Sequence, residues 1–282
     1  MDFLSALRVI PERINKALLG PGHVIEPERD VVAITGGGSG LGSYLTGLCI
    51  QAGFRVAVLD VVIPAEKNRF RGAHYFACDV SRMDEVEEVR GKIADKLGPV
   101  SVLINNAAIT RSNTVQRLSY KDIEDVLRVN LYANFVTIKV FLPQMIAMER
   151  GYVVTIASVL GYVSPAKQSV YAASKAGVVS LHEALTHELQ QQGHREIKTL
   201  MISPGQLNTN LFQNVETPSN VLAPVLDPLD VAKTIIDALQ NGREGEIRLP
   251  YYANFVPLLR AAPTQLAEIV RRATGIDTAT HT

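Results

Sequence analysis

Three polar residues in the second half of the chain could together move a proton. Tyr171 and Lys175 stand four residues apart, so a helix would place both side chains on one face. A free tyrosine has a pKa of ~10, and a neighbouring ammonium lowers that pKa by favouring the phenolate. The pair could then give a proton to a carbonyl oxygen or take one from an alcohol. Ser158, thirteen residues before Tyr171, could donate a hydrogen bond to the same oxygen.

Alone, these residue types do not define a site. Tyr-x-x-x-Lys pairs occur on many solvated helices, and a serine after a strand is often a turn former. Reduction of a ketone also requires a hydride, which enzymes commonly take from a nicotinamide cofactor. The hypothesis that these residues transfer a proton therefore depends on a dinucleotide site elsewhere in the chain.

A glycine-rich turn near residue 40 meets this requirement. The apolar run 31–35 leads into the glycine-rich stretch 36–42, and a helical pattern follows over 43–52. Backbone N–H groups in a turn without Cβ atoms can approach a pyrophosphate, which then lies at the positive end of the following helix. The next strand-like run ends in Asp60, where a dinucleotide-binding unit places a carboxylate against the adenosine ribose hydroxyls.

The spacing of these glycines resembles that of the short-chain dehydrogenase/reductase family, and further motifs follow in that family's order over residues 31–209. The motifs are Gly36-x-x-x-Gly40-x-Gly42, Asp79-Val80, Asn105-Asn106-Ala107-Ala108, Asn130, Ser158, Tyr171-Ala172-Ala173-Ser174-Lys175 and Pro204-Gly205 with Thr209. One departure is Ala108, where the family usually has glycine. We expect the added methyl to shift the loop slightly without removing a reacting group.

The resemblance implies a role for each motif. Ser158, Asn130, Tyr171 and Lys175 form the catalytic set, in which Asn130 holds a water that links Lys175 to solvent. Lys175 also holds the nicotinamide ribose, while the residues after the sixth strand orient the carboxamide. The residues expected to bind the cofactor are Gly36, Ser39, Gly40, Leu41, Gly42, Asp60, Asp79, Val80, Asn106, Tyr171, Lys175, Pro204, Gly205 and Thr209.

The choice between NAD and NADP depends on the residues around the adenosine ribose. NADP-using members of the family carry a basic residue before the second motif glycine or just after the second strand, and here those positions hold Ser39 and Val61. The charge of Asp60 would also repel a 2′-phosphate. We therefore expect NAD as the cofactor and oxidation of an alcohol as the working direction.

Short β-branched runs alternate with longer helical patterns, which is typical of a parallel sheet built from βαβ units. We expect one Rossmann-like α/β domain over residues 30–250, doubly wound, with seven parallel strands and helices on both faces. An amphipathic N-terminal extension, 1–29, and an apolar C-terminal extension, 251–282, flank it. The predicted strands are Val31–Thr35, Arg55–Asp60, His74–Cys78, Val100–Ile104, Tyr152–Ile156, Ile197–Ser203 and Glu246–Leu249.

Three capping patterns predict where helices begin. Ser81, Ser119 and Asp227 each precede an acidic residue by three positions, as a cap and a first-turn acid do. The stretch Asn214–Pro228 is rich in proline and asparagine and lacks periodicity, which predicts a mobile loop.

The composition narrows the classes of function. The 28 basic and 28 acidic residues cancel, so no global field draws the protein onto nucleic acid. Cys49 and Cys78 lie in apolar stretches, which favours buried, reduced thiols and a cytoplasmic protein. No cluster has metal-ligand spacing, and no apolar run reaches the ~18 residues of a membrane span. His182 and His187 are expected to be packing or surface residues.

The substrate stays open among several hydrophobic classes. Apolar stretches at 159–163, 207–212 and 251–259 suggest a hydrophobic pocket. The apolar ending resembles the retinol and 17-beta-hydroxysteroid dehydrogenase branch of the family, so steroid, retinoid and long-chain alcohols are all candidates. The rival function is a catalytically silent NAD-binding sensor or scaffold, against which the intact catalytic set argues.

An apolar stripe with basic residues between its members marks the N-terminal extension. Its members recur at spacings of four and three, and they are Phe3, Leu7, Ile10, Ile14 and Leu18. Three interpretations stay open: contact with the cytosolic face of a membrane or lipid droplet, a subunit contact, and packing across its own domain. The family resemblance also implies a homodimer or homotetramer.

Overall fold

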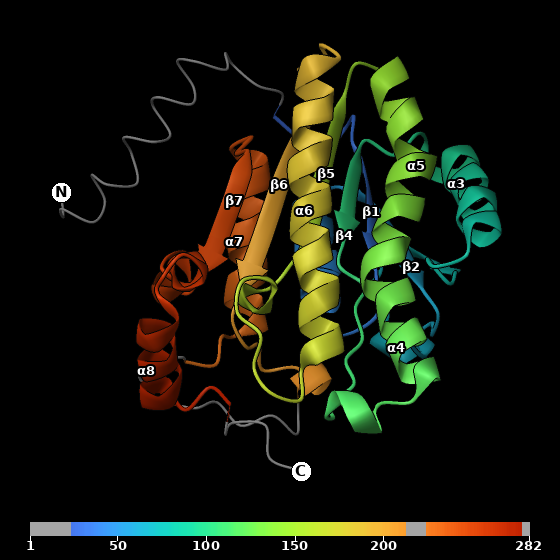
Figure 1. The fold of residues 1–282 in the computed structure, drawn as a ribbon. Coiled ribbons are helices and arrows are strands. Elements are labelled where there is room, and N and C mark those ends of the chain that lie inside the picture. Colours follow the sequence, from blue (N-terminus) through green and yellow to red (C-terminus); the bar gives the residue numbers. More distant parts are fainter. Residues whose placement is uncertain (1–23, 213–223, 278–282) are drawn as a thin grey trace.

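The computed structural model describes residues 24–212 and 224–277, which contain one seven-stranded sheet (Figure 1). All pairings are parallel, and the order across the sheet is β3-β2-β1-β4-β5-β6-β7. The strands are β1 Val31–Thr35, β2 Arg55–Asp60, β3 Ala73–Ala77, β4 Val102–Asn105, β5 Gly151–Ile156, β6 Ile197–Pro204 and β7 Gly245–Leu249. The expected Rossmann-like sheet is confirmed.

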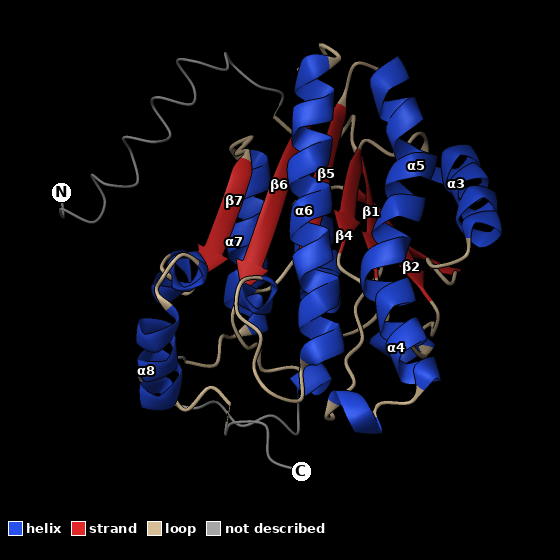
Figure 2. Cartoon of the chain, in the orientation of Figure 1, coloured by secondary structure: helices blue, strands red, loops and turns tan. Residues whose placement is uncertain are grey.

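Helices cover both faces of the sheet (Figures 1 and 2). They are α2 Gly40–Gln51, α3 Met83–Leu97, α4 Tyr120–Leu127, α5 Ala133–Ala147, α6 Ser169–Gln191, α7 Pro228–Gln240 and α8 Thr264–Thr274. The apolar residues of α2 and α7 pack on one face, and those of α3, α5 and α6 pack on the other. The result is three layers, with the sheet in the middle.

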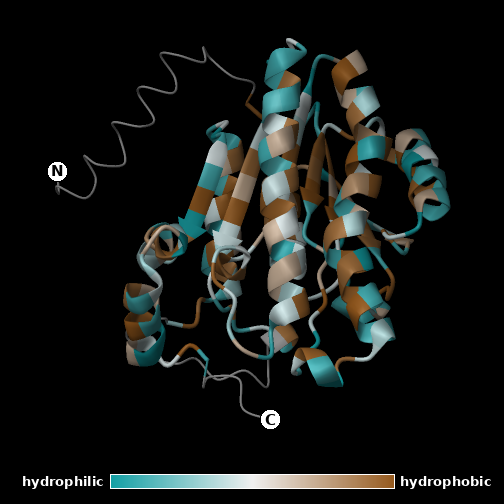
Figure 3. Cartoon of the chain, in the orientation of Figure 1, coloured by the Kyte–Doolittle hydropathy of each residue, from teal (hydrophilic) through white to brown (hydrophobic). Residues whose placement is uncertain are grey.

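Burial on both faces explains why the central strands are continuously apolar. Every residue of β1, β4, β5 and β6 is buried. Successive side chains point to opposite faces, so each strand contributes to both apolar cores. Figure 3 shows the hydrophobic colouring along these strands.

Two of the three capping predictions are confirmed. Ser119 caps α4 in a capping box, and Asp227 caps α7 by accepting from the first turn. The Ser81 prediction is wrong by one residue: Arg82 occupies the N-cap position of α3, and the Ser81 hydroxyl donates to Asp79 instead. The predicted strands agree with the observed ones except for small shifts at their ends.

The predicted mobile loop lies largely outside the described residues, which exclude 213–223. Of its remaining part, Leu226 forms a bridge to Leu207, and Pro228 already begins α7. The apolar stripe of the N-terminal extension, within 1–23, also lies outside the described residues.

The C-terminal extension continues past the last strand as helical turns. Two 3-10 helices, Tyr251–Asn254 and Val256–Arg260, lead into α8. In Figure 1, α8 stands apart from the sheet, at the end where the strands finish. Among residues 24–212 and 224–277, no helix has the length and apolar character needed to cross a membrane.

Candidate active site

The predicted site residues gather at the carboxyl ends of the strands. β1 pairs with β2 on one side and with β4 on the other, so the strand order reverses there. In open parallel sheets, ligands bind outside the carboxyl ends at such a reversal. The glycine turn follows β1, and the catalytic residues follow β5 and begin α6.

The glycine turn after β1 has no room for side chains at Gly36 and Gly42. A Cβ on Gly42 would lie 2.1 Å from the Gly36 carbonyl oxygen, and one on Gly36 would lie 2.9 Å from Ala107 Cα. Gly40 has a φ of 50°, in the left-handed region that favours glycine. Ser39 begins α2 without a side-chain capping bond. The start of α2 therefore offers backbone N–H groups of the kind that bind a pyrophosphate.

The end of β4 holds this turn in place. Asn106 Nδ2 donates to the carbonyl oxygens of Thr35 at 2.9 Å and Gly36 at 3.1 Å. The Thr35 hydroxyl accepts from the backbone N–H groups of Asn106 at 2.9 Å and Ala107 at 3.0 Å. Thr35 was not predicted as a site residue, although a threonine between a strand and a glycine turn is a usable signal.

Asp60 lies against the glycine turn, as predicted. Its Oδ2 accepts from the Gly38 backbone N–H at 3.0 Å, and its Oδ1 accepts from Val62 at 3.1 Å. A Cβ on Gly38 would come within 2.9 Å of the carboxylate. Val61 and Val62 are exposed. The end of β2 thus presents a negative charge followed by two apolar side chains.

Four further residues predicted to bind the cofactor lie in different surroundings. Thr209, after β6, reaches the turn, where its methyl would lie 3.7 Å from a Cβ on Gly40. Asp79, after β3, accepts from the Ser81 backbone N–H at 2.9 Å and hydroxyl at 2.8 Å. Val80 beside it is buried, as is Leu41 in α2.

Tyr171 and Lys175 lie in the first turns of α6, and both side chains are buried. The Lys175 ammonium lies 5.9 Å from the centre of the Tyr171 ring and donates to the Ile156 carbonyl oxygen at 2.7 Å. Ser158, just after β5, is hydrogen-bonded to Tyr171 and donates to the Pro204 carbonyl oxygen at 3.4 Å. The structure therefore brings these three predicted catalytic residues together.

Burial dominates the proton affinities of this pair. It raises the pKa of Tyr171, and the hydrogen bond with Ser158 offsets only part of that rise. Burial also lowers the pKa of Lys175 to about 8, because the ammonium loses hydration. The expected net lowering of the Tyr171 pKa is not found in this structure, because desolvation of the phenolate is the largest effect and raises the pKa.

Asn130 lies in a π-helical turn, Arg128–Tyr132, between α4 and α5. Its Oδ1 accepts from the Ile109 backbone N–H at 2.8 Å, and its Nδ2 donates to the Ile109 carbonyl oxygen at 2.9 Å. Nδ2 also lies 3.0 Å from the hydroxyl of Ser174, the residue before Lys175. This buried amide joins the segment after β4 to α6. A π-helical turn of this kind often marks a functional position, and the sequence did not predict it.

Gly205 continues from β6 beside the C-terminal extension. Its backbone N–H donates to the Leu249 carbonyl oxygen at 2.7 Å, and a Cβ there would lie 3.1 Å from the Tyr252 hydroxyl. The segment that follows Pro204 is therefore packed closely against the end of β7.

The remaining titratable groups considered in the sequence are structural. Cys49 and Cys78 are free and buried, and desolvation raises the pKa of each thiol to about 12. His182 is buried against Thr155, with its Nδ1 3.0 Å from the threonine hydroxyl, while His187 is exposed. No group of three or more metal-ligating side chains occurs in the part of the chain that the structure describes.

A doubly wound parallel sheet, a glycine cradle and a buried Tyr–Lys–Ser set define the dinucleotide-binding class of oxidoreductases. The sequence model described as short chain dehydrogenase matches residues 30–220 of the chain. The protein therefore belongs to the short-chain dehydrogenase family.

Known relatives agree with this assignment. The chain is 30% identical to the uncharacterized oxidoreductase YDL114W of Saccharomyces cerevisiae, over 100% of this chain and 91% of that protein. It is 29% identical to estradiol 17-beta-dehydrogenase 11 of Rattus norvegicus, over 94% and 87% of the two chains. It is 32% identical to epidermal retinol dehydrogenase 2 of Mus musculus, over 85% and 81%. The expected place near the retinol and 17-beta-hydroxysteroid dehydrogenase branch is confirmed.

Solved structures share the fold. A short-chain dehydrogenase from Streptomyces avermitilis superposes with a TM-score of 0.70 at 25% identity, over 88% of this chain and 100% of that one.

Proposed function

We propose that the protein transfers hydride between NAD(H) and a hydrophobic alcohol or the corresponding ketone or aldehyde. The observation that carries this proposal is the meeting of Tyr171, Ser158 and Lys175 at the same end of the sheet as the glycine cradle. Membership of the family makes the protein an oxidoreductase. The proposal adds the cofactor and the class of substrate.

The residues of the site supply proton transfer and orientation, while a bound nicotinamide supplies or takes the hydride. The Tyr171 hydroxyl, which burial keeps protonated near neutrality, donates its proton to the carbonyl oxygen during reduction. Ser158 donates to the same oxygen as charge develops on it. By the family resemblance, Lys175 would hold the ribose of a bound nicotinamide, and Asn130, whose side-chain amide is bonded to Ile109 and Ser174, would hold a water through which protons reach Lys175.

The proposed preference for NAD rests on Asp60. Its carboxylate lies beside Gly38 in the cradle, where the adenosine ribose would bind. A 2′-phosphate there would meet this negative charge, and Val61 supplies no cation to neutralise it. The fit of the cradle is supported by Gly36 and Gly42, whose missing Cβ atoms leave the backbone accessible.

The proposed substrates are steroid, retinoid or long-chain alcohols and their oxidised forms. Relatives named for estradiol and for retinol support this class, because both compounds are largely apolar alcohols. We also propose a cytoplasmic homodimer or homotetramer that contacts a membrane or lipid droplet through a terminal extension. Exposed apolar side chains in the C-terminal extension support such a contact: Tyr251, Phe255, Leu258, Leu266 and Ile269.

A substrate panel tests the proposal. Steroid, retinoid and long-chain alcohols are mixed with NAD, and the matching ketones and aldehydes with NADH, while the absorbance of the reduced nicotinamide is followed. We expect turnover with at least one of these classes. An absence of turnover in a protein that still binds NADH would favour the silent sensor or scaffold.

A further inference from the structure

One loop connects Ser158 to the helix that carries Tyr171. Ser158 caps a 3-10 helix that ends at Gly161, and the chain then runs to Lys167 before α6 begins at Ser169. We refer to residues 161–167 as the connecting loop. Because the loop joins two catalytic residues, its conformation affects how their hydroxyl groups face a substrate.

The connecting loop is held in a conformation that is not relaxed. Lys167 has a φ of 62°, in the left-handed region that a lysine seldom adopts. Its carbonyl oxygen accepts from the Asn113 backbone N–H at 3.0 Å. Residues in such conformations persist when surrounding contacts determine them.

The first set of such contacts comes from the sheet. Tyr162 donates its hydroxyl to Glu246 Oε1 on β7 at 2.7 Å. The same oxygen accepts from the Ser203 hydroxyl at 2.6 Å, and the Arg248 guanidinium lies 5.1 Å above the Tyr162 ring. The connecting loop is therefore anchored by one side chain to the edge of the sheet.

The second set of contacts comes from the C-terminal extension. Arg260 Nε donates to the Tyr162 carbonyl oxygen at 2.8 Å, and its second guanidinium nitrogen donates to the Gly161 carbonyl oxygen at 3.2 Å. These bonds fix the first part of the connecting loop.

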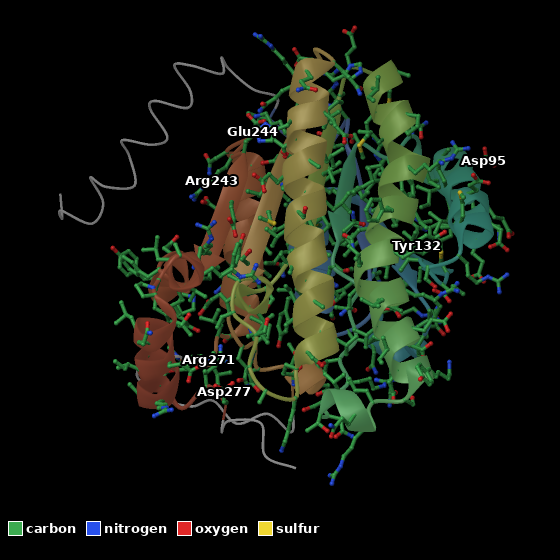
Figure 4. All side chains as sticks on the ribbon, viewed as in Figure 1. Asp95, Tyr132, Arg243, Glu244, Arg271 and Asp277 are labelled. Carbon is green, nitrogen blue, oxygen red and sulfur yellow. The ribbon has the colours of Figure 1, made fainter. Side chains whose placement is uncertain are left out.

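Arg271 and Asp277 bind the second part. Arg271 donates to the Ser164 carbonyl oxygen at 2.9 Å, and Asp277 accepts from the Ala166 backbone N–H at 3.0 Å. The two side chains also pair with each other in a two-pronged ion pair, at 3.0 Å and 2.5 Å. Figure 4 shows them between α8 and the rest of the domain.

Helix α8 has little apolar packing of its own. None of its residues is buried, and Leu266 and Ile269 are more than half exposed. The polar bonds of Arg271 and Asp277 to the connecting loop therefore contribute to the attachment of this helix.

We propose that residues 256–277 form a clasp that holds the connecting loop, and that Arg271 and Asp277 are positioning residues for the substrate. This inference rests on the proposed function, because the clasp acts on Ser158 and Tyr171 through the loop. The cofactor cradle is built from other segments, after β1, β2 and β4. Loss of the clasp should therefore raise the KM for the substrate and leave the affinity for the cofactor unchanged.

Amide hydrogen exchange of the full-length protein tests the physical contact without any assay of activity. In Arg271→Met, we expect peptides covering 161–167 to exchange at least about tenfold faster than in the unaltered protein. Arg271→Lys keeps the charge and should restore part of the protection. Arg272→Met, an exposed neighbour on α8, is the matched control and should leave the loop unchanged. Asp277→Asn provides a second, milder variant if Arg271→Met does not fold.

Steady-state kinetics tests the positioning role. In Arg271→Met, we expect the KM for the alcohol to rise at least about fivefold, with the dissociation constant for NADH changed less than twofold. Unchanged loop exchange, or faster exchange with an unchanged KM, would overturn the proposal. An unaltered protein without turnover would instead contradict the proposed function, and the exchange measurement would still decide whether the clasp exists.

Discussion

The pKa values of Tyr171 and Lys175 shift in opposite directions for one physical reason. Burial penalises the charged form of each, so the pKa of the phenol rises and the pKa of the ammonium falls to about 8. Ser158 and the Ile156 carbonyl oxygen supply the bonds that hold the two groups in place. Tyr171 is therefore a proton donor whose buried environment favours the protonated phenol.

Removing the Tyr171 hydroxyl should separate binding from turnover. In Tyr171→Phe, we expect kcat to fall by roughly 10²–10⁴-fold, because the proton donor is lost. NADH affinity should change little, since the cradle is made by other segments. The measurements are kcat and a fluorescence titration with NADH. Tyr120→Phe, at an exposed tyrosine, is the control, and turnover of Tyr171→Phe within threefold of the original would contradict the mechanism.

Asp60 should determine which dinucleotide is used. We expect the protein to prefer NAD over NADP by at least roughly tenfold, which is only about 1.4 kcal/mol. Asp60→Ala should weaken NAD binding and relieve the repulsion of NADP. Adding Val61→Arg should supply a cation for the 2′-phosphate and invert the preference. The check is kcat/KM for each cofactor, and equal use of both by the unaltered protein would show that Asp60 does not exclude the phosphate.

At the scale of elements, two irregular segments position the site. The glycine turn brings the start of α2 close to β1 and β4, and the π-helical turn brings Asn130 to α6. The glycine turn depends on a close approach of backbone, and the π-helical turn depends on the side-chain bond of Asn130 to Ser174. Regular elements supply the frame, and the irregular ones place the functional groups.

Adding a single methyl group should have different effects at a glycine of the cradle and at a glycine elsewhere. In Gly42→Ala, the new Cβ would clash with the Gly36 carbonyl oxygen 2.1 Å away, so we expect NADH affinity to fall at least about tenfold and the Tm to decrease. Gly91→Ala in α3 is the matched control, because nothing lies within 4 Å of its Cβ. That variant should keep its NADH affinity and gain roughly 0.5–1 kcal/mol of stability. Normal cofactor binding by Gly42→Ala would argue against a pyrophosphate site at this turn.

At the scale of the whole molecule, His182 should make folding sensitive to acid. Burial lowers the pKa of His182 from its usual 6.5 to about 4. Between these pH values the unfolded chain binds a proton at His182 that the folded protein does not. The free energy of unfolding therefore decreases as the pH falls from 6.5 towards 4. The loss from this residue is up to about 3 kcal/mol.

Denaturant unfolding at pH 7 and pH 4.5 measures this contribution. His182→Met should lose less stability on acidification than the unaltered protein does. His187→Met changes an exposed histidine on the same helix and should keep the original pH dependence. An identical loss of stability in His182→Met would show that other groups cause the acid sensitivity.

The role of the N-terminal extension in membrane contact can be tested by removing residues 1–20. We expect the core and its NADH affinity to be unchanged, because β1 begins only at Val31. Partition onto liposomes should weaken, since burial of the N-terminal apolar stripe would contribute a few kcal/mol at roughly 25 cal/mol per Å². Equal partition of the shortened and full-length proteins would leave packing or a subunit contact as the role of the stripe.

The sequence by itself determined the class of fold and the approximate bounds of the seven strands. Apolar strand runs separated by helical patterns predict a parallel doubly wound sheet, because strands covered on both faces must be apolar throughout. Local spacing was sufficient for Tyr171 and Lys175, which one helix holds, and for the glycine turn, whose geometry depends on neighbouring residues.

Only the tertiary structure decided how these segments act on one another. The pKa of Tyr171 depends on burial, which arises from distant segments and opposes the effect expected from Lys175. The bonds of Thr35 to the end of β4 and of Arg271 to the connecting loop join residues far apart in the chain. Contacts of this kind leave no periodic pattern in the sequence, because each is created by packing of the complete fold.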